Sequence, residues 1–524
     1  MALLRRHSTP LLFGLLVAVA AVAFLPAVSS GFAADDFILL RTLGRSSGIG
    51  WVFSHNDIGA ASGHFYRPLW LLWHLGIERV SGSAWAFHLG NLILYVVIAL
   101  EVWLLARRLV GLPSAWVAAF AFAVYPQHGE SVAWISGSTD LVATALGLPA
   151  VLCALVYWRP GPRAVAAAGF AAAAALAKES AFVLPLLAAV AVWAARGPRR
   201  RWIAPVAMAA AQIVVLAVRA AVVGGLGGYS EYPWTPLRFL AGLVSYGAAA
   251  LSPPQLELLR DPALLVVPLA ALVFVVFAVR SLWRRGEGER LRLALAGVAW
   301  FGIALLPSLN LAVDLNTANG ERLLFLPSVG LAVALAALVP VRSGSTVLAL
   351  ASAGVAALAL SLLAAQTWQG AGELTRRVVH QAAALAPPGG ELVAVTLPEE
   401  YRSAHVLPGI TLSAALERAG VHTLVTPCIP VIVRTQTPGA VTLAAVGASW
   451  DARTTWDAPF DVPVLRSPSP VSADCRWTAD DTWPPGLELR AIATPNPSRQ
   501  PVVTAYFDGR DLVKAPGAGS APAP

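Results

Sequence analysis

The sequence predicts a polytopic α-helical membrane protein of about 11 transmembrane helices, with a small β-rich extracytoplasmic domain at its C-terminal end. Three observations lead to this fold class. The 524 residues are 57% apolar and 13% charged, with a mean hydropathy of +0.67, which is far from the composition of a soluble globule. Clusters of arginine alternate with long apolar stretches. From about residue 385, short strand-like runs replace them.

The arginine clusters predict the topology. They are Arg5 with Arg6, Arg107 with Arg108, Arg159 with Arg163, Arg196 with Arg199 to Arg201, Arg280 with Arg284, Arg285, Arg290 and Arg292, and finally Arg342. Cytoplasmic loops of membrane proteins carry the excess of Lys and Arg, so each cluster is expected in the cytoplasm. Each stretch between two clusters must then cross the bilayer an even number of times. This places the N-terminus inside and the C-terminus outside. Since these anchors account for most of the net charge of +8, no nucleic-acid partner is expected.

The first predicted element is an apolar helix over residues 10–30. Arg5 and Arg6 before the run, and small residues around Ala33, also fit a cleavable signal peptide. We favour an uncleaved helix because the run of about 20 residues is long enough to span the bilayer. The first external loop, 31–83, carries aromatic and basic residues suited to interfacial helices, and residues 84–106 cross back inward.

Two helical hairpins follow. Residues 109–158 form one, with a polar tip from Tyr125 to Asp140. Residues 164–195 form the other: as one helix, these 32 residues would run about 48 Å, well beyond a hydrocarbon core of about 30 Å. A break at Lys178-Glu179 leaves two arms of about 21–24 Å each, so this tip is expected below the outer surface, at the depth of lipid headgroups.

The remaining apolar stretches complete the helical part. Two stretches are long enough to span the bilayer, residues 202–223 and 264–279. A third crossing by residues 236–251 would make the number of crossings between two arginine clusters odd. We therefore predict that 236–251 is a re-entrant or surface-lying helix on the outer side. Residues 291–307 and 323–341 form the last hairpin. Residues 345–366 cross once more.

The predicted domains are 1–370 for the transmembrane part, 385–512 for the β-rich part and 513–524 for a disordered, Pro- and Ala-rich tail. The expected strands are residues 391–397, 421–425, 431–435 and 440–446. Cys153 lies in an apolar stretch and is expected to fill core space. Cys428 and Cys475 lie in the β-rich part, where a disulfide would form only in an oxidising compartment, and we leave their pairing open.

Ionisable residues gather at the predicted outer tips, and such groups at a membrane face indicate a functional site. Asp35-Asp36 directly follow the first helix. They could act as general base for an acceptor hydroxyl, or bind a divalent cation together with lipid phosphate; the alternative is a solvated helix end. No other metal site is expected.

Four cations are expected on the outer side: Arg67, Lys178, Arg219 and Arg322. They suit a reaction with a lipid-phosphate leaving group, because guanidinium and ammonium groups stabilise a departing phosphate. The alternatives are an Arg219 that snorkels to the interface and a Lys178–Glu179 ion pair that only locks its hairpin. A third group is expected to orient the sugar or tie the loops together, and comprises His64, His128, Glu130, Asp140, Glu179 and Glu321.

A series of short motifs carries a resemblance to a known family. In chain order they are Asp35-Asp36, Ser62-Gly-His-Phe-Tyr-Arg-Pro-Leu69, Phe87-His-Leu-Gly-Asn91, Tyr125-Pro-Gln-His-Gly-Glu-Ser-Val-Ala133, Gly137-Ser-Thr-Asp-Leu141, Ala177-Lys-Glu179, and Leu306-Pro-Ser-Leu-Asn310 with Glu321-Arg-Leu-Leu-Phe-Leu-Pro-Ser328. Over residues 30–370 this series resembles the GT-C superfamily of membrane glycosyltransferases. It is most similar to the TMTC-type (transmembrane and tetratricopeptide repeat) O-mannosyltransferases.

The resemblance implies a sugar donor linked to polyprenyl or dolichyl phosphate, an inverting transfer, and Asp35 or Asp36 as the base. This chain departs from the family pattern in three places. Tyr125 stands where the family has the first His of its H-P-x-H element, and Ser138 stands where it has an Arg. The tetratricopeptide repeats are replaced by the β-rich domain, so neither mannose nor a protein acceptor is carried over.

Three functions are therefore compared. The first is a glycosyltransferase that moves a sugar from a polyprenyl-phosphate donor to a hydroxyl of a protein or cell-envelope glycan. It would work in the bacterial inner membrane, with membrane lipid as a further partner and its site on the extracytoplasmic face. The second is a transporter or flippase, whose charges should line a path near the bilayer midplane, often in paired repeats. The third is a non-catalytic scaffold that displays the β domain. The clustering of charges at one face favours the first.

Overall fold

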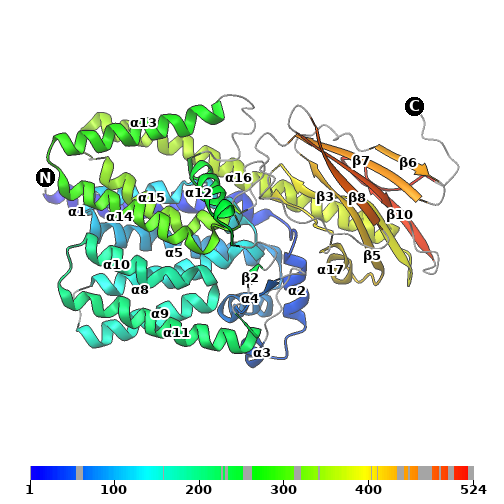
Figure 1. The fold of residues 1–524 in the computed structure, drawn as a ribbon, viewed down its shortest axis with the longest axis horizontal. Helices are drawn as coiled ribbons and strands as arrows, with labels where there is room; N and C mark the ends of the chain where they lie inside the picture. Colours follow the sequence, from blue (N-terminus) through cyan, green and yellow to red (C-terminus); the bar gives the residue numbers. More distant parts are fainter. Residues whose placement is uncertain are drawn as a thin grey trace.

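The computed structural model describes residues 2–54, 63–156, 159–225, 228–229, 234–251, 263–311, 320–339, 341, 343–402, 404–409, 411–433, 442–446, 449–457, 475–482, 486–493 and 501–516. A helical domain extends to Leu385, and a β domain follows from Glu391 to Lys514. Figure 1 shows the two domains at opposite ends of the molecule, with the start of α1 at the far end of the helical domain.

The helical domain contains long apolar helices and shorter ones. The helices are α1 (Ala2–Ala23), α2 (Asp36–Gly44), α3 (Ile49–Ser54), α4 (Pro68–Val80), α5 (Ala84–Leu109), α6 (Leu112–Ala123), α7 (Gly129–Ala133), α8 (Thr139–Leu155), α9 (Pro160–Ala177), α10 (Leu184–Ala194), α11 (Ile203–Val223), α12 (Pro236–Leu251), α13 (Ala263–Arg284), α14 (Gly288–Leu305), α15 (Phe325–Leu338) and α16 (Gly344–Leu385). Short 3-10 turns link several of them: η1 (Leu25–Ser29), η2 (Pro126–His128), η3 (Ser136–Ser138), η4 (Glu179–Val183), η5 (Arg199–Trp202), η7 (Leu306–Ser308) and η8 (Glu321–Leu324).

Six helical segments among the described residues are long and apolar enough to cross a membrane. Several shorter apolar helices, such as Thr9–Ala23 and Leu112–Ala123, accompany them. The chain is therefore a multi-pass membrane protein, as predicted. The count of about 11 crossings and their orientation stay predictions.

The predicted break in the second hairpin is confirmed. Helix α9 ends at Ala177, Lys178 has extended backbone angles (φ −159°, ψ 147°), and the chain turns through η4 into α10. The segment 31–83 contains α2, α3 and α4, so it is helical as expected, while its external, interfacial position stays a prediction. A two-residue strand, β1 (Gly63–His64), pairs with β2 (Gly228–Tyr229), a link that the sequence did not predict.

Two helices need comment. Helix α12 runs across the direction of the long helices in Figure 1, in agreement with a helix that does not cross. The crossing predicted at 345–366 lies within α16, which has 42 residues and continues to Leu385. At 1.5 Å per residue this helix measures about 63 Å, roughly twice the hydrocarbon core. In Figure 1 it extends out of the helical domain and along the β domain.

Small residues let the helices approach closely, as is usual between helices in membranes. A Cβ at Gly297 of α14 would lie 2.5 Å from the Gly330 carbonyl oxygen, and a Cβ at Gly330 of α15 would lie 2.4 Å from that of Gly297. These two helices therefore pack backbone to backbone. One large cluster of buried side chains continues from the helical domain into the β domain, where it includes Leu392 and Phe507.

The β domain consists of two sheets and one helix. The strands are β3 (Glu391–Tyr401), β4 (Ala404–His405), β5 (Leu424–Val433), β6 (Thr442–Val446), β7 (Ser449–Asp457), β8 (Cys475–Thr482), β9 (Gly486–Ala493), β10 (Val502–Phe507) and β11 (Leu512–Lys514), with α17 (Thr411–Arg418) between β4 and β5. In one sheet β3 is central: it pairs in parallel with β5 and β10, and antiparallel with β4, while β11 extends the sheet beyond β10. The other sheet has the order β6-β7-β9-β8.

The strand predictions need one correction. The two short strands expected at 421–425 and 431–435 form a single strand, β5. It continues through Pro427 and Pro430, the residues that suggested a turn. Cys428, on this strand, is disulfide-bonded, and Cys153 in α8 is a free, half-buried thiol. The tail expected from 513 begins later, because β11 extends to Lys514; residues 517–524 lie outside the described part.

Candidate functional site

Asp35 and Asp36 lie in a tight turn between η1 and α2. Asp36 is almost fully buried (1% exposed) and accepts two backbone hydrogen bonds: Ala33 N donates to Oδ2 at 3.0 Å and Ser136 N donates to Oδ1 at 2.8 Å. Asp36 therefore fixes the turn and attaches it to the tip of the first hairpin. Asp35 is half-buried and is close enough to Arg322 and to Asp36 for electrostatic interaction.

Lys178 forms a buried ion pair with Asp140. Asp140 is in the first turn of α8, and Lys178 occupies the extended break that follows α9. The ion pair expected between Lys178 and its neighbour Glu179 is wrong: the two adjacent residues take different partners. The extended backbone at Lys178 separates their directions, because successive side chains of an extended chain point to opposite sides.

Glu179 receives two guanidinium groups from elsewhere in the chain. Arg67 Nη2 lies 2.8 Å from Glu179 Oε2, and Arg219 Nη1 lies 3.1 Å from Glu179 Oε1. Arg67 is the N-cap of α4 and Arg219 is near the end of α11. Two arginines that converge on one carboxylate form a geometry in which they can also hold phosphate oxygens.

Glu130 and Arg322 join the first hairpin tip to the start of the last one. Glu130 is fully buried (0% exposed), forms an ion pair with the Arg322 guanidinium, and accepts a hydrogen bond from Arg322 N at 2.7 Å. The Arg322 guanidinium also lies over the Trp134 ring, 5.1 Å from its centroid. Electrostatic interactions connect Arg322 further to Asp35, Asp140 and Lys178. The acids and bases of four distant segments thus form one cluster.

The remaining predicted residues divide between the loops and the core. His128 is buried, with Nδ1 3.0 Å from the Tyr95 hydroxyl and Nε2 2.9 Å from Ser328 Oγ, and it packs between Phe122 and Phe325. Its contacts are those of a residue that ties helices together. Glu321 is buried in η8. His64 is in β1, and its side chain lies outside the described part.

The two departures from the family motifs are both accommodated by packing. The Tyr125 hydroxyl donates a hydrogen bond to Ala250 O at 2.8 Å and so caps the C-terminal end of α12. Ser138 is fully buried: its hydroxyl accepts from Trp70 Nε1 at 3.2 Å and donates to Ile135 O. An arginine at position 138 would require this region to repack.

Sequence analysis missed residues that the β domain brings to the cluster. His405 Nε2 lies 3.9 Å from Glu130 Oε1, and the His405 ring lies 4.9 Å from the Trp134 ring. Glu399 is close enough to Asp35 for electrostatic interaction. No motif in the β-rich segment marks these residues, and they follow Asp35 by more than 360 positions, so no local pattern could have identified them.

The titration of the groups outside the membrane-spanning segments reflects their enclosure. Burial raises the pKa of Asp36 to about 7, although the hydrogen bonds from Ala33 and Ser136 oppose the rise. Burial and the nearby Asp35 raise the pKa of Glu399 to about 7. Burial, together with the Arg322 charge, lowers the pKa of His405 to about 3, so this imidazole is neutral near pH 7.

The divalent cation considered at Asp35 and Asp36 finds little support in their contacts. Both carboxylate oxygens of Asp36 are engaged by backbone N–H groups, so the pair does not present two open carboxylates. Among the described residues, no group of three or more His, Cys, Asp or Glu side chains is arranged to hold a metal ion.

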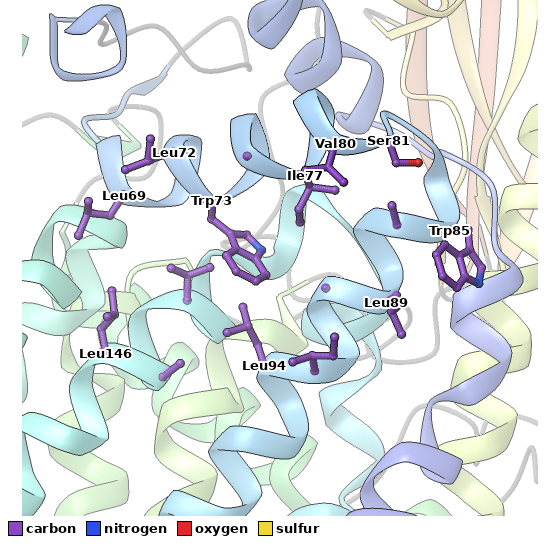
Figure 2. A pocket seen from close by; sticks show the side chains of 16 residues that line it. Leu69, Leu72, Trp73, Ile77, Val80, Ser81, Trp85, Leu89, Leu94 and Leu146 are labelled. Atoms are coloured by element: carbon purple, nitrogen blue, oxygen red, sulfur yellow. The ribbon is translucent and has the colours of Figure 1, made fainter. Parts of the chain in front are cut away.

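An apolar groove lies between α4, α5 and α8. It has a volume of about 780 Å³ and is lined by residues of α4, α5 and α8: Leu69, Leu72, Trp73, Gly76, Ile77, Val80, Ser81, Trp85, Ala86, Leu89, Gly90, Ile93, Leu94, Val142, Ala145 and Leu146. Figure 2 shows Trp73 projecting from α4 towards α5. Leu69 and Val142, which line the groove, follow Arg67 and Asp140 by two residues in the chain.

Comparison with known proteins gives one match in sequence. No protein-family model matches the chain. Over 208 residues it is 34% identical to the protein O-mannosyl-transferase Tmtc2 of Drosophila melanogaster. The match takes in 36% of this chain and 22% of the length of that relative.

Solved structures of glycosyltransferases resemble the fold loosely. ArnT from Cupriavidus metallidurans bound to undecaprenyl phosphate is 14% identical, with a TM-score of 0.39 over 79% of this chain and 85% of ArnT. The arabinofuranosyltransferase AftD from Mycobacteria is 20% identical, with a TM-score of 0.38 over 78% of this chain and 32% of AftD. The motifs and the Tmtc2 match agree: the chain resembles GT-C membrane glycosyltransferases and is most like the TMTC-type O-mannosyltransferases.

Proposed function

We propose that this protein is a membrane glycosyltransferase that moves a sugar from a polyprenyl-phosphate donor to an acceptor hydroxyl on the extracytoplasmic face. The observation that carries the proposal is the convergence of Asp35, Lys178, Arg67 and Arg322, from four separate segments, in one cluster. An apolar groove between α4, α5 and α8 accompanies it. The acceptor is a hydroxyl of a protein or of a cell-envelope glycan. The likeness to Tmtc2 supports the class of reaction.

The groove suits the lipid part of such a donor. It is lined almost entirely by apolar side chains, and Val80 (88% exposed), Trp85 (58%) and Ile93 (54%) leave it open to the surroundings of the helices. A polyprenyl chain in the groove would bring its phosphate to the charged cluster. There Arg67 and Arg219, which already surround one anionic carboxylate, are the best placed groups to hold the phosphate oxygens.

Of the two aspartates, Asp35 is the better candidate for the base. Asp36 is engaged by two backbone N–H groups and is closed to solvent, whereas Asp35 is half-buried and faces Arg322. In the proposed step the Asp35 carboxylate takes the proton of the acceptor hydroxyl, whose oxygen attacks the anomeric carbon. The bond from that carbon to the phosphate oxygen breaks, and the polyprenyl phosphate leaves. A single displacement inverts the configuration at the anomeric carbon.

Asp35→Asn tests this assignment. Purified protein in lipid nanodiscs is supplied with radiolabelled polyprenyl-phosphate sugars and candidate acceptors. We expect kcat to fall by about 10²- to 10⁴-fold in Asp35→Asn, since removal of a general base typically costs that much, with donor affinity unchanged. Glu289→Gln, a change at a side chain that is 73% exposed at the start of α14, is the control.

Transfer by Asp35→Asn at the wild-type rate would remove the proposed base. If the wild type transfers none of the sugars but moves the labelled lipid across the bilayer, the protein is a flippase and the proposed function is wrong.

A further inference from the structure

The β domain reaches the charged cluster through the β3–β4 hairpin and the residue after it. Val406 O accepts a hydrogen bond from Ala34 N at 2.7 Å, next to Asp35 in the chain. Val406 N donates to Glu399 O at 2.7 Å, and Thr375 Oγ1 of α16 donates to Val406 O at 3.2 Å. One backbone group of the β domain is therefore hydrogen-bonded to the turn that presents the proposed base.

That turn has an unusual backbone. Ala34 has φ +49°, a left-handed conformation that alanine rarely adopts and that persists only where the surroundings hold it. The hydrogen bond from Ala34 N to Val406 O provides such a constraint. Because Asp35 follows directly, the direction of its carboxylate depends on this conformation.

Two ionisable side chains of the same hairpin complete the surroundings of the cluster. Glu399 is half-buried and is close enough to Asp35 for electrostatic interaction. His405 Nδ1 lies 3.9 Å from Glu400 Oε1, and its Nε2 lies 3.9 Å from Glu130 Oε1. The His405 ring packs against Trp134, which is itself stacked on Trp368 of α16 at 6.1 Å. The charged cluster thus contains groups from both domains.

We propose that the β domain is part of the reaction centre: Val406, the residue after its β3–β4 hairpin, holds the Ala34–Asp36 turn that presents Asp35. His405, with Trp134 and Trp368, forms the adjoining wall of the site. This inference rests on the proposed function for its activity readout. It assigns to the β domain a task that a separate acceptor-binding module would not have.

The activity test compares His405→Ala and His405→Phe with the wild type in the full chain. We expect His405→Ala to lower kcat by about 10- to 100-fold, the usual effect of losing a group that orients a reactive centre, with the KM for the polyprenyl-phosphate donor within about 2-fold. His405→Phe keeps a ring against Trp134 and is expected to recover part of the rate. The matched control is Glu417→Gln on α17 of the same domain, where the partly exposed carboxylate pairs with Arg41 at 3.8 Å and with Arg45 at 3.9 Å.

A second measurement does not need the substrate. In hydrogen–deuterium exchange of the wild-type chain, the backbone amide of Ala34 is expected to be protected, because it donates a hydrogen bond to Val406 O across the contact between the domains. Rapid exchange of this amide would overturn the proposal whatever the activity. A protected Ala34 amide together with a wild-type kcat in folded His405→Ala would overturn the role of His405 in the site. If the wild type transfers no sugar, the proposed function fails, and the exchange of Ala34 alone decides whether the β domain holds the turn.

Discussion

Lys178 shows that the charges of this cluster are buried at a cost in desolvation free energy. The ammonium group is buried against the Asp140 carboxylate, with Arg67 and Arg322 near enough to act on it electrostatically. A buried ion pair is weak evidence for stability, because desolvation offsets most of the attraction between its partners. A structural pair could be replaced by apolar residues, whereas a cation that acts on a donor phosphate could not.

This difference gives a prediction at the residue scale. Lys178→Met leaves the Asp140 carboxylate buried without its counter-ion, and we expect a loss of about 3–5 kcal/mol in the free energy of unfolding. The double variant Lys178→Met/Asp140→Leu should recover most of that stability but not the transfer activity. Thermal unfolding in detergent and the transfer assay measure the two effects. Recovery of both in the double variant would show that Lys178 is only structural.

Asp36 gives a prediction on pH. Burial raises the pKa of Asp36 from 3.8 to about 7, so the folded protein binds this proton more tightly than the unfolded chain. The contribution of protonated Asp36 to the free energy of unfolding is fully present below pH 3.8 and is lost as the pH rises through about 7. His405, whose pKa burial lowers to about 3, acts in the opposite direction below its ordinary value of 6.5. The dependence of the wild-type stability on pH therefore contains the effects of both groups.

The comparison with Asp36→Asn isolates the aspartate. The variant loses an acceptor for one of two backbone N–H groups, so it is expected to be less stable than the wild type at pH 4 by about 1–3 kcal/mol. That difference should shrink as the pH rises to about 7, because only the wild type is then forced to bury a charge. Unfolding midpoints at several pH values test this, and a difference that stays constant would contradict the raised pKa.

At the scale of the element, α12 shows how a short apolar helix packs against the helical domain. Leu237, Leu240 and Val244 are exposed on one face, whereas Tyr246 and Ala249 are buried on the other. The carbonyls at its C-terminal end accept hydrogen bonds from Tyr125 and from Gln127 Nε2, the latter at 2.7 Å. The helix is thereby fixed to the tip of the first hairpin.

Two glycines of α12 provide a matched pair of substitutions. A Cβ at Gly242 would lie 2.0 Å from the Leu309 carbonyl oxygen, whereas a Cβ at Gly247 would meet no atom within 4 Å. We expect Gly242→Ala to lower the free energy of unfolding by about 1–3 kcal/mol, the usual cost of overpacking. Gly247→Ala should be neutral or stabilising by up to about 1 kcal/mol, since alanine favours the helix. Equal effects at both positions would mean that α12 does not pack as described.

At the scale of the whole molecule, the arginine clusters of the predicted cytoplasmic loops and the charged cluster of the candidate site belong to different segments of the chain. Arg163 Nη2 donates to Arg200 O at 2.7 Å, so two of the basic clusters lie together. The carboxylates and cations of the hairpin tips meet in the cluster described above. This separation is what the positive-inside rule predicts for a protein whose site is on the outer face.

Labelling of single cysteines tests the orientation. We expect Arg45→Cys and Arg510→Cys, whose native side chains are 67% and 80% exposed, to react with a membrane-impermeant thiol reagent added outside intact cells. Arg285→Cys, at the exposed end of α13, should react only after the membrane is opened. Reaction of Arg285→Cys in intact cells would contradict the N-in, C-out topology and, with it, the extracytoplasmic site.

The sequence by itself determined the long helices, the β-rich character of the C-terminal part and the gathering of the polar tips, while the side of the membrane that the tips face stays a prediction. The break at Lys178, the helices of the first external loop and the acidic turn at Asp35 were all predictable, because hydropathy, helix length and charge bias are local properties of the chain. Only the tertiary structure decided which charges meet. Lys178 pairs with Asp140, Glu179 with Arg67 and Arg219, and Glu399 approaches Asp35 from another domain. Such pairings depend on distances through space between residues far apart in the chain, and periodicity carries no information about them.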